Sequence, residues 1–283
     1  MHTLVIDTSF GSTVGVVGHD PVVEHDSRTH VEKLRNDIDA ACRQAGVAPH
    51  EAERIVVGVG PAPFTGLRAG IVTAKAIAYA TGATLLGQDD LTPNAVLMHY
   101  AHRHDPRFAD RFDYADVSVV TDGTPRVALT LSVNDARRRQ LYFGLYADLD
   151  AGTGDPTTLI DMDIDAPDHI ARRVGEAVDR YRDAHPGVDV VLDVVGHGAR
   201  KYASAWDGLA RLETVSDIGA LDMGAAGLAL FADVAQAHAT ADEGTGAVEP
   251  LYLRRPDVSV PNPLKHVLNH DPAHGTGDGA ATA

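Results

Sequence analysis

The polar tip of a predicted hairpin near the start of the chain carries residue types that suit phosphate and metal chemistry. The tip lies between two short apolar segments and contains Asp7, Thr8, Ser9 and Gly11. A carboxylate can hold magnesium through water, while hydroxyls and backbone N–H groups can bind phosphate oxygens. The same residues also suit an ordinary hairpin loop that closes its own hydrogen bonds. The tip is therefore a candidate nucleotide site with a purely structural alternative.

A second candidate is the turn from Gly60 to Gly66, which separates a β-branched run from a long apolar segment. Two prolines in this turn fix φ and remove two N–H donors, so neither regular structure can continue through it. The phosphate loop of nucleoside triphosphatases needs Lys and then Ser or Thr directly after its last glycine. Leu67 and Arg68 follow Gly66 here. The residue types therefore argue against a phosphate loop.

The other residues of metal-binding or nucleophilic type do not have the spacing of a catalytic site. His99, His102 and His104 do not share one helical face, which favours a solvated helix end over a metal site. Cys42 is the single cysteine, and the sequence has neither His-Glu-x-x-His nor Gly-x-Ser-x-Gly. We therefore expect no metal site and assign no catalytic residue.

Two elements must position the Gly60–Gly66 turn. Ile55–Val59 predicts a strand that is buried on both faces. The segment that follows predicts a helix capped by Thr65 and ended by Gly82. This helix is apolar nearly all round, so we expect one face to pack on its own sheet and the other on a second partner. Burial inside a large domain and a subunit interface remain equal alternatives for that second face.

An amphipathic helix precedes this strand. Thr29 and Glu32 form a capping-box pattern, and Gly46 predicts the end of the helix. One apolar stripe contains Val31, Leu34, Ile38, Cys42 and Ala45.

The second half of the chain repeats the hairpin pattern. Val127–Leu131 and Leu141–Tyr146 predict paired strands around a turn that contains Asp135 and Arg137, for which we favour a turn-stabilising role. A later strand ends in Gly196-His197-Gly198, whose glycines can turn the backbone and present N–H groups to a phosphate.

Composition narrows the function classes. The chain has 283 residues, 44% of them hydrophobic, and a formal net charge of −16, which argues against a surface that binds nucleic acid by itself. We expect that no apolar run approaches the roughly 18 to 20 residues of a membrane span, and no leader pattern opens the chain, so we expect a cytoplasmic protein without a membrane segment.

The turn and the helix that follows it carry a family resemblance. Gly60–Gly70, followed by Ala74 and Lys75, resembles the glycine-proline-x-x-phenylalanine-threonine-glycine-leucine-arginine signature of the TsaB family, also called YeaZ. The Asp135–Arg137 turn and the closing Pro250–Arg254 segment are similar to the family as well. The chain departs from the family pattern at Ala62, Pro63 and His197, the last of which stands where the family tends to have an acid.

The resemblance implies two α/β domains of the actin/Hsp70/sugar-kinase (ASKHA, ribonuclease H-like) type. We place them at residues 1–104 and 117–256, with a linker at 105–116 and a disordered tail at 257–283. In this fold the first hairpin faces nucleotide phosphates. Asp7, Thr8, Ser9 and Gly11 are therefore the candidate residues for ATP or ADP with Mg at a subunit interface, without a tightly bound cofactor.

The resemblance also implies a function. TsaB is a non-catalytic subunit needed to make threonylcarbamoyladenosine on the tRNA adenosine beside the anticodon. It binds a TsaD-like catalytic subunit, or a second copy of itself, and works with a TsaE-like ATPase, so contact with tRNA is indirect. The expected partner-binding residues lie on two helices: His30, Lys33, Leu34, Asp37, Arg68, Val72, Lys75, Ala76 and Tyr79.

Two observations separate this function from enzymatic alternatives. TsaD has two metal-binding histidines four residues apart, where this chain has His30 and Leu34. Leucine cannot ligate a metal, so the resemblance implies that transfer chemistry is absent here. The alternative is an enzyme in its own right, either a nucleotide-dependent kinase of this fold or a glycoprotease-like peptidase. The sequence shows neither a general base for the first nor a catalytic motif for the second.

Overall fold

Two five-stranded sheets share one strand order. The first runs β3-β2-β1-β4-β5 and the second β8-β7-β6-β9-β10. In each, the central strand pairs antiparallel with the next strand of the chain and parallel with a later one. This repetition confirms the predicted α/β class and the predicted duplication. The strands are β1 Thr3–Asp7, β2 Ser12–Val16, β3 Val22–Glu24, β4 Arg54–Gly60, β5 Thr84–Asp89, β6 Arg126–Asp135, β7 Leu141–Leu149, β8 Pro156–Asp165, β9 Asp189–Val195 and β10 Leu212–Ser216.

The structure is a computed structural model that describes residues 1–26, 29–109, 111, 117–119, 125–149, 154–241 and 248–254. Its α-helices are α1 His30–Gln44, α2 Phe64–Thr81, α3 Thr92–Ala101, α4 Pro167–Ala184, α5 Ala203–Trp206 and α6 Gly224–Ala241. Short 3-10 turns occur at η1 Pro49–Glu51, η2 Pro106–Phe108, η4 Arg200–Tyr202 and η5 Ala220–Met223.

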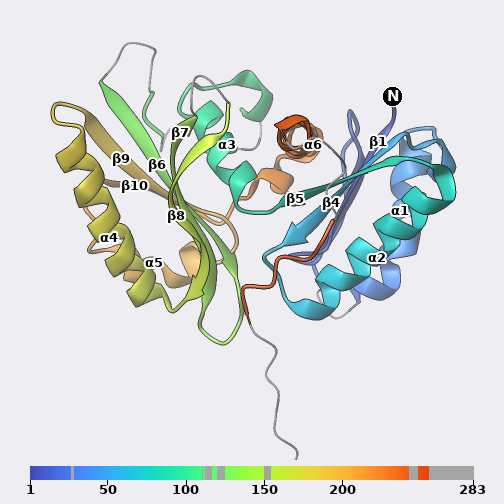
Figure 1. Ribbon diagram of the computed structural model, residues 1–283, viewed down its shortest axis with the longest axis horizontal. Coiled ribbons are helices and arrows are strands. Elements are labelled where there is room, and N and C mark those ends of the chain that lie inside the picture. The colour runs from blue at the N-terminus through green and yellow to red at the C-terminus, as the bar shows by residue number, and fades with distance from the viewer. Residues whose placement is uncertain are drawn as a thin grey trace, which may run out of the picture. The chain divides into compact units, whose positions relative to one another are not determined.

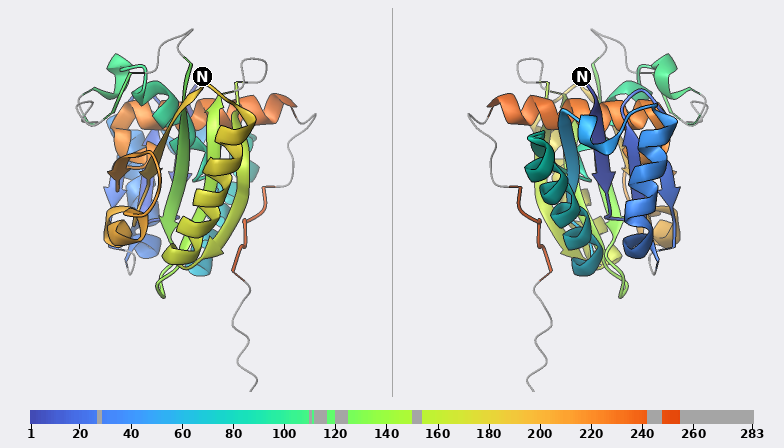
Figure 2. Two further views of the ribbon diagram at one scale, coloured as in Figure 1. Left: turned by 90° about the vertical axis from the view of Figure 1, so that its left-hand side faces the viewer. Right: turned by 90° about the vertical axis from the view of Figure 1, so that its right-hand side faces the viewer.

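The sheets and helices form five layers (Figure 1). Helices α1 and α2 cover the outer face of the first sheet, and α4 and α5 cover the outer face of the second (Figure 2). Helices α3 and α6 lie between the two sheets. The two halves exchange helices here, because α3 follows the first sheet in the chain but packs on β6 and β7, while α6 follows the second sheet but packs on β5.

Strand β4 is buried on both faces, as its composition predicts. Ile55 and Val57 pack with α1 and α2, whereas Val56 packs with Leu228 and Phe231 of α6. Side chains alternate between the faces of a strand, so a continuous apolar run needs apolar partners on both sides. Those partners come from opposite ends of the chain.

The starts of α1 and α2 differ from the sequence predictions. Pro63, with extended backbone at φ −60° and ψ 135°, precedes the first residue of α2, so Thr65 lies inside the helix and does not cap it. Thr29 has helical backbone and makes no capping hydrogen bond, so the predicted capping box does not form. The predicted stop is confirmed, because Gly82 adopts the left-handed conformation at φ 77°.

One stretch corrects the expectation that no apolar run approaches the length of a membrane span. Ala220–Ala239 is long and apolar enough to cross a membrane by length and composition, and 56% of it is buried inside the protein. Its apolar side chains pack on both sheets. The composition of α6 is therefore explained by its place between two sheets, since a helix with two buried faces must be apolar nearly all round.

The predicted linker begins with an ordered turn. Phe108 is buried and packs with Leu97 and Met98 of α3. Residues 110 and 112–116 of the predicted linker lie outside the described residues, as does the predicted tail at 257–283.

We predict that Phe231→Ala lowers the free energy of unfolding by about 3–5 kcal/mol, because the ring is fully buried against the first sheet. Urea unfolding followed by circular dichroism measures this change. Tyr79→Ala on α2 is the matched control and should stay within about 0.5 kcal/mol of the wild type, since that ring is 94% exposed. Equal losses in the two variants would contradict the packing of α6 on the first sheet.

Candidate functional site

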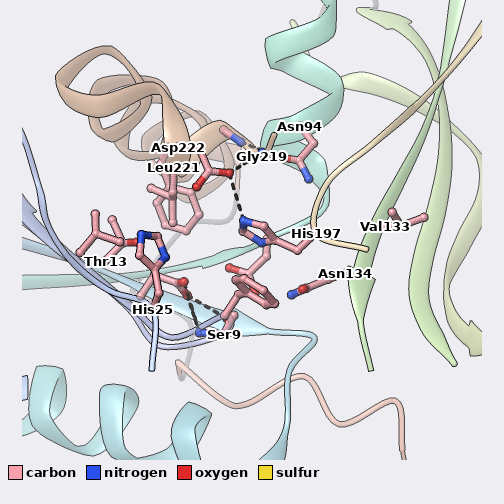
Figure 3. A pocket seen from close by; sticks show the side chains of 16 residues that line it. Ser9, Thr13, His25, Asn94, Val133, Asn134, His197, Gly219, Leu221 and Asp222 are labelled. Carbon is pink, nitrogen blue, oxygen red and sulfur yellow. Dashed lines mark hydrogen bonds and ion pairs between the residues drawn. The ribbon is translucent and has the colours of Figure 1, made fainter. Parts of the chain in front are cut away.

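A cleft lies between the two sheets and takes residues from both halves. It is lined by the first hairpin, by the ends of β5 and β6, by the turn after β9 and by η5. Figure 3 shows these side chains converging on one point, with Ser9 from the first half and Asn94, Asn134 and His197 around the same space. The carboxyl ends of parallel strands β1, β4 and β5 reach this region, which is where open α/β sheets bind ligands.

Asp7 ends β1 and is buried in the cleft. Ser9 holds it through a backbone N–H at 3.2 Å and a hydroxyl at 2.8 Å, both donated to the carboxylate. A Cβ atom at Gly58 on β4 would lie 2.0 Å from the nearer Asp7 oxygen, so glycine there makes room for the carboxylate. Asp7 and Ser9 thus form the local hydrogen-bonded turn that was the structural alternative for the hairpin tip, and their role in nucleotide binding stays a prediction.

Asp90 is the second buried carboxyl of the cleft, and the sequence analysis missed it. It directly follows β5 and has no hydrogen-bond partner among the described residues. Burial raises its pKa well above the ordinary value, and the charge of Asp7 raises it further. Burial also raises the pKa of Asp7, partly offset by the hydrogen bonds from Ser9. Two adjacent carboxyls in a dry site do not both ionise readily, so the pair retains a proton to higher pH than an exposed pair.

His197 bridges the cleft from the second half. Its ring stacks on Phe10 of the first hairpin, with centroids 3.9 Å apart, and its Nε2 atom lies 3.0 Å from Asp222 (Figure 3). Burial acts to raise the pKa of Asp222, but the hydrogen bond and charge of His197 outweigh it and leave the pKa below its ordinary value. His197 therefore joins the two sides of the cleft through a ring stack on Phe10 and a polar contact with Asp222.

The cleft leaves little room beside Asp7. The cavity that includes Asp7, Asp90 and His197 has a volume of about 40 Å³, whereas a neighbouring opening has about 330 Å³. The larger opening lies between the hairpin tip, the N-terminus of α2 and the β6–β7 turn, and it includes Arg137. A nucleotide needs hundreds of cubic ångströms, so the larger opening is the better place for one.

Two of the four predicted nucleotide residues have structural roles in the hairpin. The Thr8 hydroxyl donates to the Gly66 carbonyl at 2.9 Å and packs against Gly70, which ties the hairpin to α2. Gly11 has φ 71°, and a Cβ atom there would lie 2.2 Å from the Glu24 carbonyl oxygen. Both residues also line the larger opening, so their positions are compatible with the predicted ligand contact.

The turn after β9 does not offer its N–H groups to an external anion. Gly196 and Gly198 adopt positive φ values of 110° and 101°, as predicted for a sharp turn. The N–H groups of Gly198 and Arg200 donate to the Asp217 carboxylate at 3.2 and 2.9 Å. A carboxylate of the chain itself thus occupies the predicted phosphate platform.

The turn between β6 and β7 has the predicted stabilising contact. Asp135 accepts a hydrogen bond from the Arg137 N–H at 2.8 Å, and Lys201 also donates to Asp135 at 2.7 Å. Arg137, Arg138 and Arg139 all have positive φ.

The predicted partner-binding residues of α2 form one exposed surface, here called the α2 surface. It consists of Arg68, Val72, Lys75, Ala76 and Tyr79. Val72 is 63% exposed and Tyr79 is 94% exposed, although both are large and apolar or aromatic. The opposite side of α2, including Leu67 and Ile71, is buried on the first sheet. The helix therefore has two apolar faces, as predicted, and within the described residues only one is covered.

The predicted residues of α1 divide between surface and core. Lys33 is exposed and pairs with Glu24, and Asp37 accepts a hydrogen bond from Ser12 at 3.4 Å. Leu34 is only 3% exposed and packs in the core of the first sheet, so its side chain does not reach the surface in this structure. The side chain of His30 lies outside the described part of the structure.

The expectation of a solvated histidine cluster is wrong for His102. Its side chain is 1% exposed, and its Nε2 atom lies 2.6 Å from the buried Asp193. His99 instead pairs with Asp148. The sequence spacing could not show this, because Asp193 lies 91 residues away on β9.

We predict that Asp90→Asn reduces the pH dependence of stability. A carboxyl whose pKa is raised by folding stabilises the native state below the unfolded pKa, and that stability is lost as the pH rises through the native pKa. The wild type should lose about 1.4 kcal/mol for each pH unit by which the native pKa of Asp90 exceeds the unfolded value, and the variant should not.

Urea unfolding at intervals from pH 4 to 8 measures this slope. The exposed Asp207→Asn substitution is the matched control and should follow the wild type. An Asp90→Asn variant that loses stability as steeply as the wild type would contradict a raised pKa at this position.

Comparisons of sequence relate this chain to two kinds of protein. The family model "TsaD: tRNA N6-adenosine threonylcarbamoyltransferase" matches residues 20–109, which include α1 and α2. An uncharacterized protein of Mycobacterium tuberculosis is 29% identical over 262 residues, which cover 90% of this chain and 92% of that protein. A tRNA N6-adenosine threonylcarbamoyltransferase of Ruegeria pomeroyi is 31% identical over 102 residues, but these are only 26% of its length.

Comparison of structures gives the fold. YeaZ from Pseudomonas aeruginosa superposes with a TM-score of 0.59 at 20% identity, covering 89% of this chain and 99% of YeaZ. A second Pseudomonas aeruginosa structure, described as similar to peptidase YEAZ, gives a TM-score of 0.57 with the same coverage. The predicted α/β fold, with its two five-stranded sheets, is thereby confirmed as the fold of the YeaZ structures. The chain thus has the YeaZ fold over nearly its whole length and is similar to the TsaD family model over residues 20–109.

Proposed function

We propose that this chain is a non-catalytic subunit of the cytoplasmic machinery that makes threonylcarbamoyladenosine on tRNA. Its task is to bind and activate a TsaD-like catalytic subunit, together with a TsaE-like ATPase. The observation that carries the proposal is the α2 surface, where large side chains remain open to solvent on a helix whose other face is fully packed. Exposed apolar patches of this kind mark protein interfaces.

The rim of this surface is held in place by the C-terminal segment. The Arg68 guanidinium stacks over Phe64 at 4.0 Å and donates to the Tyr252 hydroxyl at 2.6 Å. Lys75 pairs with Glu249 at 3.2 Å. An apolar centre with ordered charges around it is the usual anatomy of a specific interface, in which the charges set partner choice.

Two features support an accessory role in preference to catalysis. Leu34 stands at the second metal-ligand position implied by the TsaD resemblance, and it is part of the hydrophobic core. The cleft that would hold a substrate in an enzyme of this fold is narrowed by the stack of Phe10 on His197. A partner subunit needs neither group, because it acts by binding the active form of its partner more tightly than the inactive form.

We propose that the nucleotide and the tRNA bind to the assembled complex and not to this chain alone. In this proposal ATP or ADP with Mg occupies the opening beside the hairpin tip, where Arg137 and the N-terminus of α2 can meet phosphates once a partner covers the site. The net charge of −16 disfavours phosphate binding by the chain alone, so a partner subunit holds the tRNA.

The same α2 surface also fits a second copy of this chain, in which case the interface would be the same but the partner would differ. The competing function is a stand-alone ASKHA enzyme, which would act without a partner and for which the buried Asp7 and Asp90 are the supporting observation.

We predict that this chain forms a one-to-one complex with the TsaD-like protein of its own organism, and that Ala76→Glu abolishes it. A carboxylate placed between Val72 and Tyr79 would have to lose its hydration when the apolar centre of the interface is buried. Size-exclusion chromatography with light scattering measures the complex, with and without ATP.

Ala184→Glu, exposed at the far end of α4, is the matched control and should bind like the wild type. A wild-type chain that stays separate from the TsaD-like protein under every nucleotide condition would count against the proposal. An ATPase or peptidase activity of the chain alone would favour the competing function.

A further inference from the structure

A buried cluster outside the cleft brings together three side chains with metal-binding atoms. His102 follows the last residue of α3, Asp193 lies on β9 and Glu213 lies on β10. One ligand atom from each lies within 4.8 Å of the others. The side chains of His102 and Asp193 are 1% and 0% exposed, and Glu213 is partly buried.

A break in the strand register places Glu213 in this cluster. Leu212 pairs with Leu192, and Thr214 pairs with Asp193, so Glu213 is an extra residue of β10 opposite β9. Such a bulge redirects a side chain and is uncommon between parallel strands. It sets Glu213 beside Asp193, on the face of β9 that turns towards α3.

The polar atoms of the cluster are not satisfied by one another. Asp193 Oδ1 and Glu213 Oε2 are buried and have no hydrogen-bond partner within the described part of the chain. A fully buried carboxylate oxygen without a partner is costly, so it points to a missing ligand. The Ser118 carbonyl lies 2.7 Å from His102 Nδ1, and the other Glu213 oxygen accepts a hydrogen bond from the Ser118 N–H at 3.1 Å.

These contacts have the arrangement of a metal site with its supporting hydrogen bonds. An Nδ1–H donated to a backbone carbonyl fixes the imidazole ring and leaves the lone pair on Nε2 for a cation. His102 Nε2 faces Asp193, whose free Oδ1 and the free oxygen of Glu213 supply two further ligands. One imidazole and two carboxylates form a donor set that Zn²⁺ and similar divalent ions accept.

We propose that His102, Asp193 and Glu213 bind one first-row divalent cation, with Zn²⁺ as the probe, at a structural site that joins α3 to the second sheet. Two ligand atoms of a tetrahedral zinc ion lie roughly 3.4 Å apart. The 2.6 Å contact between His102 and Asp193 therefore opens by less than about 1 Å, while the proton on Nε2 is released to solvent. This site departs from the sequence-based expectation that the chain holds no metal.

The test is a competition titration of the full, untagged chain with Zn²⁺ against a chromophoric chelator. The wild type should bind one ion per chain, and His102→Gln and Glu213→Gln should each weaken binding at least tenfold. Glu213→Gln is the principal variant because its side chain is only partly buried, so the fold should survive the change. Glu176→Gln on the exposed side of α4 is the control and should bind like the wild type.

Thermal unfolding gives an independent readout. Zn²⁺ in excess should raise the Tm of the wild type and of Glu176→Gln more than that of Glu213→Gln, because the stabilisation by a ligand grows with its affinity for the folded state. Wild-type binding that is no tighter than that of Glu213→Gln would overturn the proposal, since the ion would then occupy other side chains. The absence of a bound ion in the wild type would overturn it as well.

Discussion

The exchange of α3 and α6 between the two sheets is the constraint on which the rest of the structure depends. Each sheet is apolar on both faces, and each obtains one of its cover helices from the other half of the chain. The two helices contact each other between the sheets, and the Ala220 N–H donates to Asn94 at 2.7 Å. Neither sheet can bury its inner face without this shared layer, so the halves must fold around each other.

This shared layer determines what the cleft can do. The ends of α3 and η5 form one wall, and the first hairpin forms the other. Because packing fixes the position of this wall, the stack of Phe10 on His197 and the contact of His197 with Asp222 narrow the cleft. The buried carboxyls of the cleft, Asp7 and Asp90, lower the stability of the fold at neutral pH. Buried groups with perturbed pKa values of this kind are typical of functional sites.

The outer layer has the opposite character. Helix α2 uses small residues to approach its own sheet and leaves Val72 and Tyr79 in water. The interior of the chain is therefore fully packed, while one face of the outer helix α2 remains uncovered. In the function that we propose, a partner subunit covers this face, and binding stabilises the active conformation of the partner.

Sequence patterns predicted the elements that depend on local periodicity. The β-branched run of β4, the glycine that ends α2 and the repeated hairpin were all recognisable, because their signals lie within a few residues. The extended Pro63 before α2 overrode the capping preference of Thr65. The sequence analysis did not identify β8, an edge strand with a mixed burial pattern, or β10 with its bulge.

Contacts between distant segments could not be predicted in this way. The pairing of His102 with Asp193 and the stacking of Phe10 on His197 join residues from different halves of the chain. Asp90 offered a usable signal, since it follows a strand parallel to β1 and β4 and therefore reaches the same edge as Asp7. The burial of Leu34 could have been predicted from its place on the apolar stripe of α1, but the resemblance placed Leu34 itself among the expected partner-binding residues.

The most direct test of the proposed function is a reconstituted tRNA modification assay with the TsaD-like and TsaE-like proteins of the same organism. Formation of threonylcarbamoyladenosine would be measured by mass spectrometry of digested tRNA, with this chain present or omitted. We expect modified adenosine only when the chain is present, and none from the chain alone. Equal modification without the chain would contradict its role as a required subunit.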